Sequence, residues 1–279
     1  MRHSIILLAT AAAALSAGAA EAATIEIRDA VARVTVVPQD RADIKVEVIK
    51  PNAELPLKVS VSGDRTLVDG DLDHRIRSCN GMGDNARVSV RGVGRVSYAE
   101  LPEVVVYTPK DVKLEANGAV VGAIGRSASL ELKNSGCANW TIADVDGEAE
   151  LRQSGAGNVK MGSAGRLDVH LSGAANIDAV AARDGMDARL SGAGNVRLKS
   201  LSGPVYAQVS GVGQVRIADG RASQMRASVS GIGQVDFGGQ AQDLQASISG
   251  LGQISVREVT GSVSKSVSGG GSIKVGNRS

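Results

Sequence analysis

Apolar and polar residues alternate along most of the chain, and a Ser-Gly corner recurs between the alternating segments. Before two of these corners the chain reads VYAQV (205–209) and MRASV (225–229), and after them it reads VRI (215–217) and VDF (235–237). A period of two is typical of strands that bury one face. The pattern therefore predicts a short β-strand on each side of every corner.

Each corner belongs to a repeat of the form S-G-x-G-[NQ]-[VI]. Two short strands in about 19 residues cannot bury a core alone, but coils stacked about 4.8 Å apart can. The rule for parallel crossovers favours right-handed winding. The sequence thus predicts an all-β fold, a right-handed parallel β-helix (solenoid) of about nine coils over residues 111–279. The motif serines are Ser135, Ser154, Ser172, Ser191, Ser210, Ser230, Ser249 and Ser268.

The first 110 residues lack this period. Met1-Arg2-His3 is a basic start, residues 5–15 are mostly apolar, and Ala20-Glu21-Ala22 has the form of a cleavage site. This run is shorter than the roughly 20 residues of a membrane span, so we predict a signal peptide over 1–22 and no membrane-spanning segment. The mature chain is expected to be exported to the periplasm, the cell surface or the medium. Residues 23–110 alternate irregularly and are predicted to form a β cap or irregular first coils.

Stacked coils place equivalent residues in columns. The position three before the motif serine shrinks from Leu151 to Ala246, while the position two after it grows from Ala156 to Leu251. Close-packed interiors demand such compensation in volume. We therefore expect both columns to face one packed interior, without a pore.

One column of the repeat consists of amide side chains. An amide recurs four residues after the serine, and stacked amides hydrogen-bond from coil to coil. We predict that this ladder is structural, the alternative being a set of sugar or metal ligands. Its members are Asn139, Asn158, Asn176, Asn195, Gln214, Gln234 and Gln253.

Charged columns lie before the serine. An acidic stripe four positions before it (Glu131, Glu150, Asp168, Asp187) runs beside a basic stripe two positions before it (Lys133, Arg152, His170, Arg189). In the preceding coil Lys113 and Glu115 swap the order. In later coils both columns lose most of their charge, and we predict a partner surface there, the alternative being an inert solvated face. This contact face comprises Tyr206, Gln208, Arg226, Ser228, Gln245 and Ser247.

Composition narrows the classes of function. Thirty-five glycines and only five aromatic residues do not suit a helical protein. Thirty-one basic and 29 acidic residues nearly cancel, so no nucleic-acid partner is expected. Export would place Cys79 and Cys137 in an oxidising compartment, where we predict a disulfide, the alternative being two unpaired thiols.

Motifs for catalysis and metal binding are weak. Asp168, His170 and Ser172 resemble a triad, but their columns hold other residue types in neighbouring coils. The run Asp69-Gly70-Asp71-Leu72-Asp73 lacks the later glutamate of an EF-hand and suggests an acidic turn. We expect no enzyme activity, no catalytic or metal site and no cofactor.

The repeated S-G-x-G-[NQ]-[VI] motif and the lead-in LPEVVVY (101–107) resemble the GIN domain family over roughly residues 30 to 276. Members are described as "putative auto-transporter adhesin" head domains. The resemblance implies a β-helical bacterial protein of the surface or periplasm. It supplies no catalytic residues.

These observations favour a non-enzymatic binding or structural module of the cell envelope, adhesin-like, whose partner is a glycan or protein. One alternative is a self-assembling subunit that associates through its C-terminal coil, since the repeats resemble those of curli subunits in period and in their Q-x-G-x-G-N elements. A polysaccharide-active enzyme is the third hypothesis, because polysaccharide lyases also use β-helices.

Overall fold

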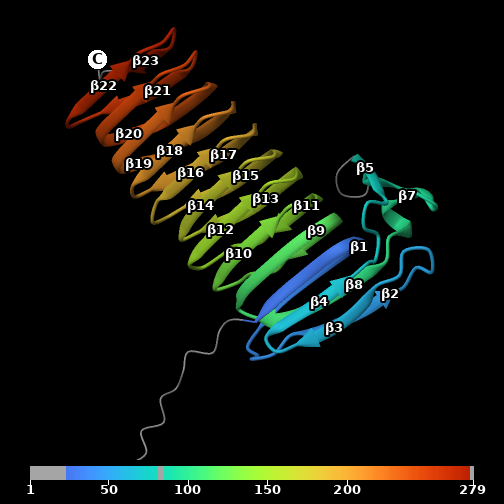
Figure 1. Ribbon diagram of the computed structural model, residues 1–279. Coiled ribbons are helices and arrows are strands. Elements are labelled where there is room, and N and C mark those ends of the chain that lie inside the picture. The colour runs from blue at the N-terminus through green and yellow to red at the C-terminus, as the bar shows by residue number, and fades with distance from the viewer. Residues whose placement is uncertain (1–22, 81–84, 277–279) are drawn as a thin grey trace, which may run out of the picture.

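The computed structural model describes residues 23–80 and 85–276, and these form a β-solenoid of stacked parallel coils (Figure 1). The predicted all-β solenoid with coils of about 19 residues is confirmed. The predicted signal peptide, residues 1–22, lies outside the described residues.

Every repeat supplies one strand before the motif and one after it, and each pairs in parallel with its equivalent in the next coil. Glu131 lies opposite Glu150, which lies opposite Asp168, so equivalent positions form continuous columns. The strands of the coils are β9 (Asp111–Ile124), β10 (Ser129–Asn134), β11 (Cys137–Ile142), β12 (Glu148–Gln153), β13 (Ala156–Ala164), β14 (Arg166–Leu171), β15 (Ala174–Ala182), β16 (Met186–Leu190), β17 (Ala193–Ser202), β18 (Val205–Val209), β19 (Val212–Val229), β20 (Ile232–Ile248), β21 (Gln253–Val259), β22 (Val263–Val267) and β23 (Ser272–Val275).

The N-terminal segment extends the same stack. Strand β1 pairs in parallel with β9, and β4 and β8 pair in parallel with β1. Two antiparallel strands, β3 on β4 and β2 on β8, then cover the end of the stack. The bounds are β1 (Thr24–Gln39), β2 (Lys45–Lys50), β3 (Lys58–Ser62), β4 (Arg65–Asp69) and β8 (Glu103–Pro109).

A small antiparallel sheet stands beside the first coils (Figure 1). Its residues Val88, Val90 and Val96 share an apolar cluster with Val31 and Ala119, which lie on the outer side of β1 and β9. A disulfide between Cys79 and Cys137, with Cα atoms 6.3 Å apart, joins this sheet to β11. The sheet consists of β5 (Ile76–Asn80), β6 (Arg87–Val90) and β7 (Gly94–Ser97), followed by the 3-10 helix η2 (Tyr98–Glu100).

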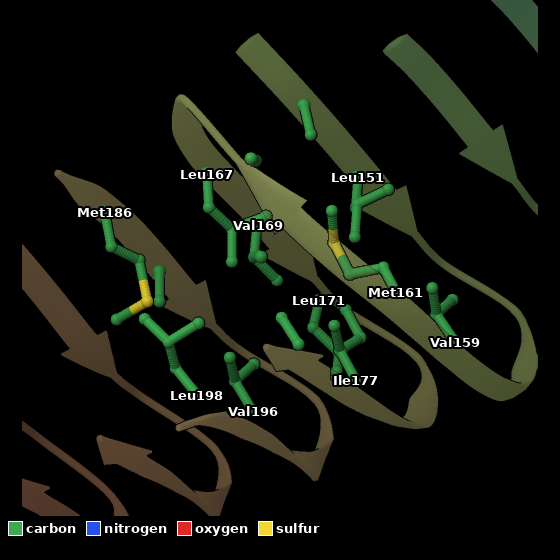
Figure 2. Close-up of a cluster of buried hydrophobic side chains, with 14 of the residues drawn as sticks. Leu151, Val159, Met161, Leu167, Val169, Leu171, Ile177, Met186, Val196 and Leu198 are labelled. Carbon is green, nitrogen blue, oxygen red and sulfur yellow. The ribbon is translucent and has the colours of Figure 1, made fainter. Parts of the chain in front are cut away.

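The interior of the solenoid is packed with aliphatic side chains from both sides of each corner, as Figure 2 shows for the coils around Leu151, Val159 and Leu198. The second inward column lies seven residues after the serine. In two coils it is large where the column three before the serine is alanine, since Ala188 accompanies Leu198 and Ala227 accompanies Phe237. The compensation is not general, because Leu151 accompanies the equally large Met161.

The column two after the serine faces solvent, so the prediction that it faces the interior is wrong. Val212 and Ile232 are each 60% exposed, and Leu251 is 65% exposed. The alternation of period two continues through the corner, which places odd offsets from the serine inside and even offsets outside. This column is two positions after the serine and therefore lies on the outer face. Its earliest members, Ala119 and Cys137, contact the small sheet.

Close stacking of the backbone explains the glycine that follows each motif serine. A Cβ atom on Gly155 would lie 1.8 Å from the carbonyl oxygen of Gly136 in the previous coil. Positive φ is not the reason here, because Gly155 is not among the positive-φ glycines, although Gly157 is, at φ +141°. The corner requires glycine because two coils pass there without space for a side chain.

Candidate functional site

A groove of about 830 Å³ runs along the solenoid at the Ser-Gly corners. It crosses successive coils from Asp29 in β1 to Ser210. Three columns line it: the basic column two before the serine, the column one before it, and the serines themselves. Because every coil contributes the same three positions, the groove is a periodic surface that suits an extended ligand more than a compact one. Its basic members are Arg28, Lys133, Arg152, His170 and Arg189, its acidic members are Glu26, Asp29 and Glu115 at the N-terminal end, and its serines are Ser135, Ser154, Ser172, Ser191 and Ser210.

Each basic side chain of the groove pairs with an acidic residue of its own strand. Lys133 Nζ lies 2.8 Å from Glu131 Oε1, and Arg189 Nη2 lies 2.7 Å from Asp187 Oδ2. The pair of Arg152 and Glu150 and the pair of His170 and Asp168 have the same arrangement. The two predicted stripes, acidic beside basic, are therefore confirmed.

Glu115, the acidic member of the swapped pair in the preceding coil, also lines the groove. Lys133 Nζ lies 3.1 Å from Glu115 Oε1, so an ion pair joins β9 to β10 as the sequence predicted. The hydrogen bond to Glu131 raises the pKa of Lys133, and the reciprocal bond lowers the pKa of Glu131. Exposed pairs of this kind contribute at most about 1 kcal/mol each, so their main effect is to hold the side chains in place.

Asp187 is the most deeply buried carboxylate of the acidic stripe. Burial raises the pKa of Asp187, while the charge of Arg189 opposes the rise and the neighbouring Asp168 adds to it. Two stacked carboxylates, Asp168 and Asp187, lie in register on β14 and β16. Arg189 and His170 are thus fixed above a partly desolvated acidic pair.

Two buried amides beside the groove were not singled out from the sequence. Asn134 and Gln153 lie in register in the column one before the serine, which holds Leu171 and Leu190 in the next coils. Both line the groove, and both are almost fully buried. The side-chain nitrogen and oxygen of Asn134 and the Nε2 of Gln153 have no hydrogen-bond partner among the described residues. Polar residues in an otherwise aliphatic column are the signal that would have found them.

The predicted contact face continues the groove toward the C-terminus. Gln208 lines the end of the groove, and its Oε1 accepts a hydrogen bond of 3.0 Å from Tyr206. The guanidinium of Arg189 lies 5.3 Å from the centre of the Tyr206 ring, which joins the charged coils to the neutral ones. On the following coils Ser247 and Ser228 form a hydrogen bond of 3.2 Å, and Arg226 and Gln245 are exposed.

The amide column lies outside the groove, on the strands that follow the corner. Hydrogen bonds of 3.1, 3.0 and 2.8 Å join Asn139, Asn158, Asn176 and Asn195 in series. Gln214, Gln234 and Gln253 continue the column in register. The asparagine side chains thus link four successive coils.

Two of the three residues that resemble a triad, His170 and Ser172, line the groove. His170 Nε2 lies 3.1 Å from Asp168 Oδ1, and within residues 23–80 and 85–276 no hydrogen bond joins His170 to Ser172.

In the acidic turn, Asp71 pairs with Lys58 at 3.0 Å. The part of the chain that the structure describes holds no group of three or more residues arranged to bind a metal ion. None of its helices combines the length and apolar character of a membrane span.

Residues 180–279 match the family model described as "Putative auto-transporter adhesin, head GIN domain". This match confirms the GIN domain resemblance. The matched segment is shorter than the expected range of 30 to 276. The GIN segment contains Arg189, Gln208 and the predicted contact face, whereas Lys133, Arg152 and His170 precede it. A search of curated proteins found no match.

Solved structures match this chain over most of its length. A "Putative lipid binding protein" from Parabacteroides distasonis ATCC 8503 is 19% identical, with a TM-score of 0.50, over 91% of this chain and 94% of its own. A "putative adhesin" from Bacteroides fragilis NCTC 9343 is 16% identical, with a TM-score of 0.45, over 91% of this chain and 93% of its own. The likeness to the Parabacteroides protein shows a common fold.

Proposed function

We propose that this protein is an exported, non-enzymatic, adhesin-like binding module of the cell envelope. The observation that carries the proposal is the groove, which presents a basic side chain and a hydroxyl group in each of four successive coils, from Lys133 to Arg189. A periodic surface matches a periodic or extended partner, such as a glycan chain or an extended peptide. The family description of the GIN segment supports an adhesin-like role.

The disulfide supports export. Cys79 and Cys137 are bridged in the structure, and disulfides persist in oxidising compartments outside the cytosol. The bridge fixes the small sheet against the first coils and leaves the groove uncovered, since none of the groove-lining residues belongs to that sheet. The periplasm and the cell surface are both oxidising, so the disulfide is compatible with either location.

Cell fractionation combined with protease treatment of intact cells tests the location. We expect the protein in the envelope fraction, with the mature chain beginning at Ala23. A strictly cytoplasmic protein would overturn the proposal. Binding of the purified mature chain to isolated envelopes tests the binding role, and absence of binding to envelopes and to cells would count against it.

Self-association through the C-terminal coil stays a prediction. On β22, the exposed Lys265 occupies the column in which the preceding coil has the buried Ala246, and a charge at this position opposes pairing of strand edges. Sedimentation over a range of protein concentrations tests this alternative, and a persistent monomer would exclude it. Incubation with a panel of polysaccharides tests the enzymatic hypothesis through chain-length analysis.

A further inference from the structure

The basic residues of the groove are the accessible members of their ion pairs. Arg152 is 51% exposed and its partner Glu150 is 25% exposed, while Arg189 is 48% exposed and Asp187 only 12%. Lys133 and His170 are likewise more exposed than their acidic partners. The carboxylates therefore lie beneath the cations, and the groove presents positive groups although the pairs are formally neutral.

These basic side chains form a straight row, in which Lys133, Arg152 and Arg189 are the cations. Lys133 lies opposite Arg152, Arg152 opposite His170, and His170 opposite Arg189. Parallel strands place consecutive members about 4.8 Å apart, so the row spans about 14 Å over three coil spacings. The motif serines follow the same coils along the groove, which places a hydroxyl group beside each cation. The order of charges is reversed at Glu115 and the charge is lost at Gln208, so the row has two defined ends.

The two buried amides do not belong to the polar surface of the groove. Asn134 and Gln153 occupy the column one before the serine, an odd offset that faces the interior, and their unpaired amide atoms are almost completely buried. The exposed row of basic side chains and the serines therefore supply the polar groups that a ligand in the groove can contact.

We infer that the groove binds a linear polysaccharide that bears carboxylate groups, an inference that rests on the proposed binding function. The carboxylates of the polymer contact the row from Lys133 to Arg189, and its hydroxyls contact the motif serines. Planar carboxylates accept paired hydrogen bonds from guanidinium groups, which Arg152 and Arg189 provide. A nucleic acid fits less well, because none of the groove-lining residues is Phe, Tyr or Trp and bases therefore lack a large stacking surface.

Titration calorimetry with polygalacturonate, using dextran as the neutral control, tests the inference. We expect polygalacturonate to bind, dextran not to bind, and the affinity to fall as salt is raised. The double variant Lys133→Gln/Arg152→Gln should lose about tenfold or more in affinity. The control is Arg197→Gln/Arg216→Gln, which removes the same charge from exposed arginines outside the groove and should change the affinity less than twofold. Circular dichroism verifies that each variant is folded.

A second variant is expected to change the affinity for polygalacturonate in the opposite direction. Glu150→Gln leaves Arg152 in place and removes the carboxylate that competes with the ligand, so the affinity for polygalacturonate should rise. Equal losses of polygalacturonate affinity in the groove and control double variants would overturn the inference. So would a lower polygalacturonate affinity of Glu150→Gln than of the wild type. A single-stranded oligonucleotide that binds as well as polygalacturonate would overturn it too.

The two proposals fail differently. If the wild type binds envelopes but neither polygalacturonate nor alginate, the ligand class is wrong and the binding function stands. If Lys133→Gln/Arg152→Gln binds envelopes as well as the wild type, the groove is not the site that recognises them. If the wild type binds no envelope preparation, the proposed function itself fails.

Discussion

Two leucines near the same corner offer a matched test of which columns form the interior. Leu244 lies in β20 and is 2% exposed, whereas Leu251 follows the corner and is 65% exposed. Both are large aliphatic residues in regular columns of the repeat. The same substitution by alanine removes the same atoms, so any difference in stability comes from the surroundings.

The expected losses differ severalfold. Leu244→Ala removes packing from a buried column between Met225 and Val263 and should cost about 2–5 kcal/mol in the free energy of unfolding. Leu251→Ala removes a side chain that is mostly in water and should change stability by about 0.5 kcal/mol or less. The difference between the two expected losses of unfolding free energy arises because Leu244 points inward and Leu251 points outward.

Urea unfolding followed by far-ultraviolet circular dichroism measures both variants. The transition midpoints are compared under identical conditions, because long repeat arrays can depart from two-state behaviour. Equal losses, or a larger loss for Leu251→Ala, would refute the assignment of the column two after the serine to the outer face. A restored stability in Leu244→Met would support packing as the cause.

Three further predictions follow from other contacts. Gly155→Ala should cost about 1–3 kcal/mol in urea unfolding because its Cβ would overlap the Gly136 carbonyl oxygen, and similar stability to the wild type would contradict this. Reduction of the Cys79–Cys137 disulfide, which closes a separation of 58 residues, should lower stability by about 4 kcal/mol, measured by thermal unfolding with and without reductant. Burial raises the pKa of Asp187, so the folded state binds this proton more tightly, and its contribution to stability should fall as pH rises through the raised pKa. Asp187→Asn should flatten that part of the pH dependence, and an unchanged slope would exclude Asp187 as its source.

Much of the architecture was determined by local repetition in the sequence. The spacing of Ser135, Ser154 and the later motif serines indicated the coil length, and alternation indicated the strands. The acidic and basic columns also followed from register, because stacked coils repeat each position. Alternation carried through the corner would likewise have placed Ile232 outside. Inferring its face from size alone produced the wrong assignment.

Only the tertiary structure decided where the groove lies and what covers the outer face. The groove depends on how the chain bends at each corner, and residue order does not specify that bend. The small sheet of β5, β6 and β7 packs on Val31 and Ala119 through contacts between segments far apart in the chain, and no repeat predicts such contacts. The accessibility of Arg152 above Glu150 is equally a property of the packed coil. The repeat places equivalent residues of successive coils opposite one another. Contacts between a coil and a segment outside the repeat, such as the small sheet, depend on packing that the repeat does not encode.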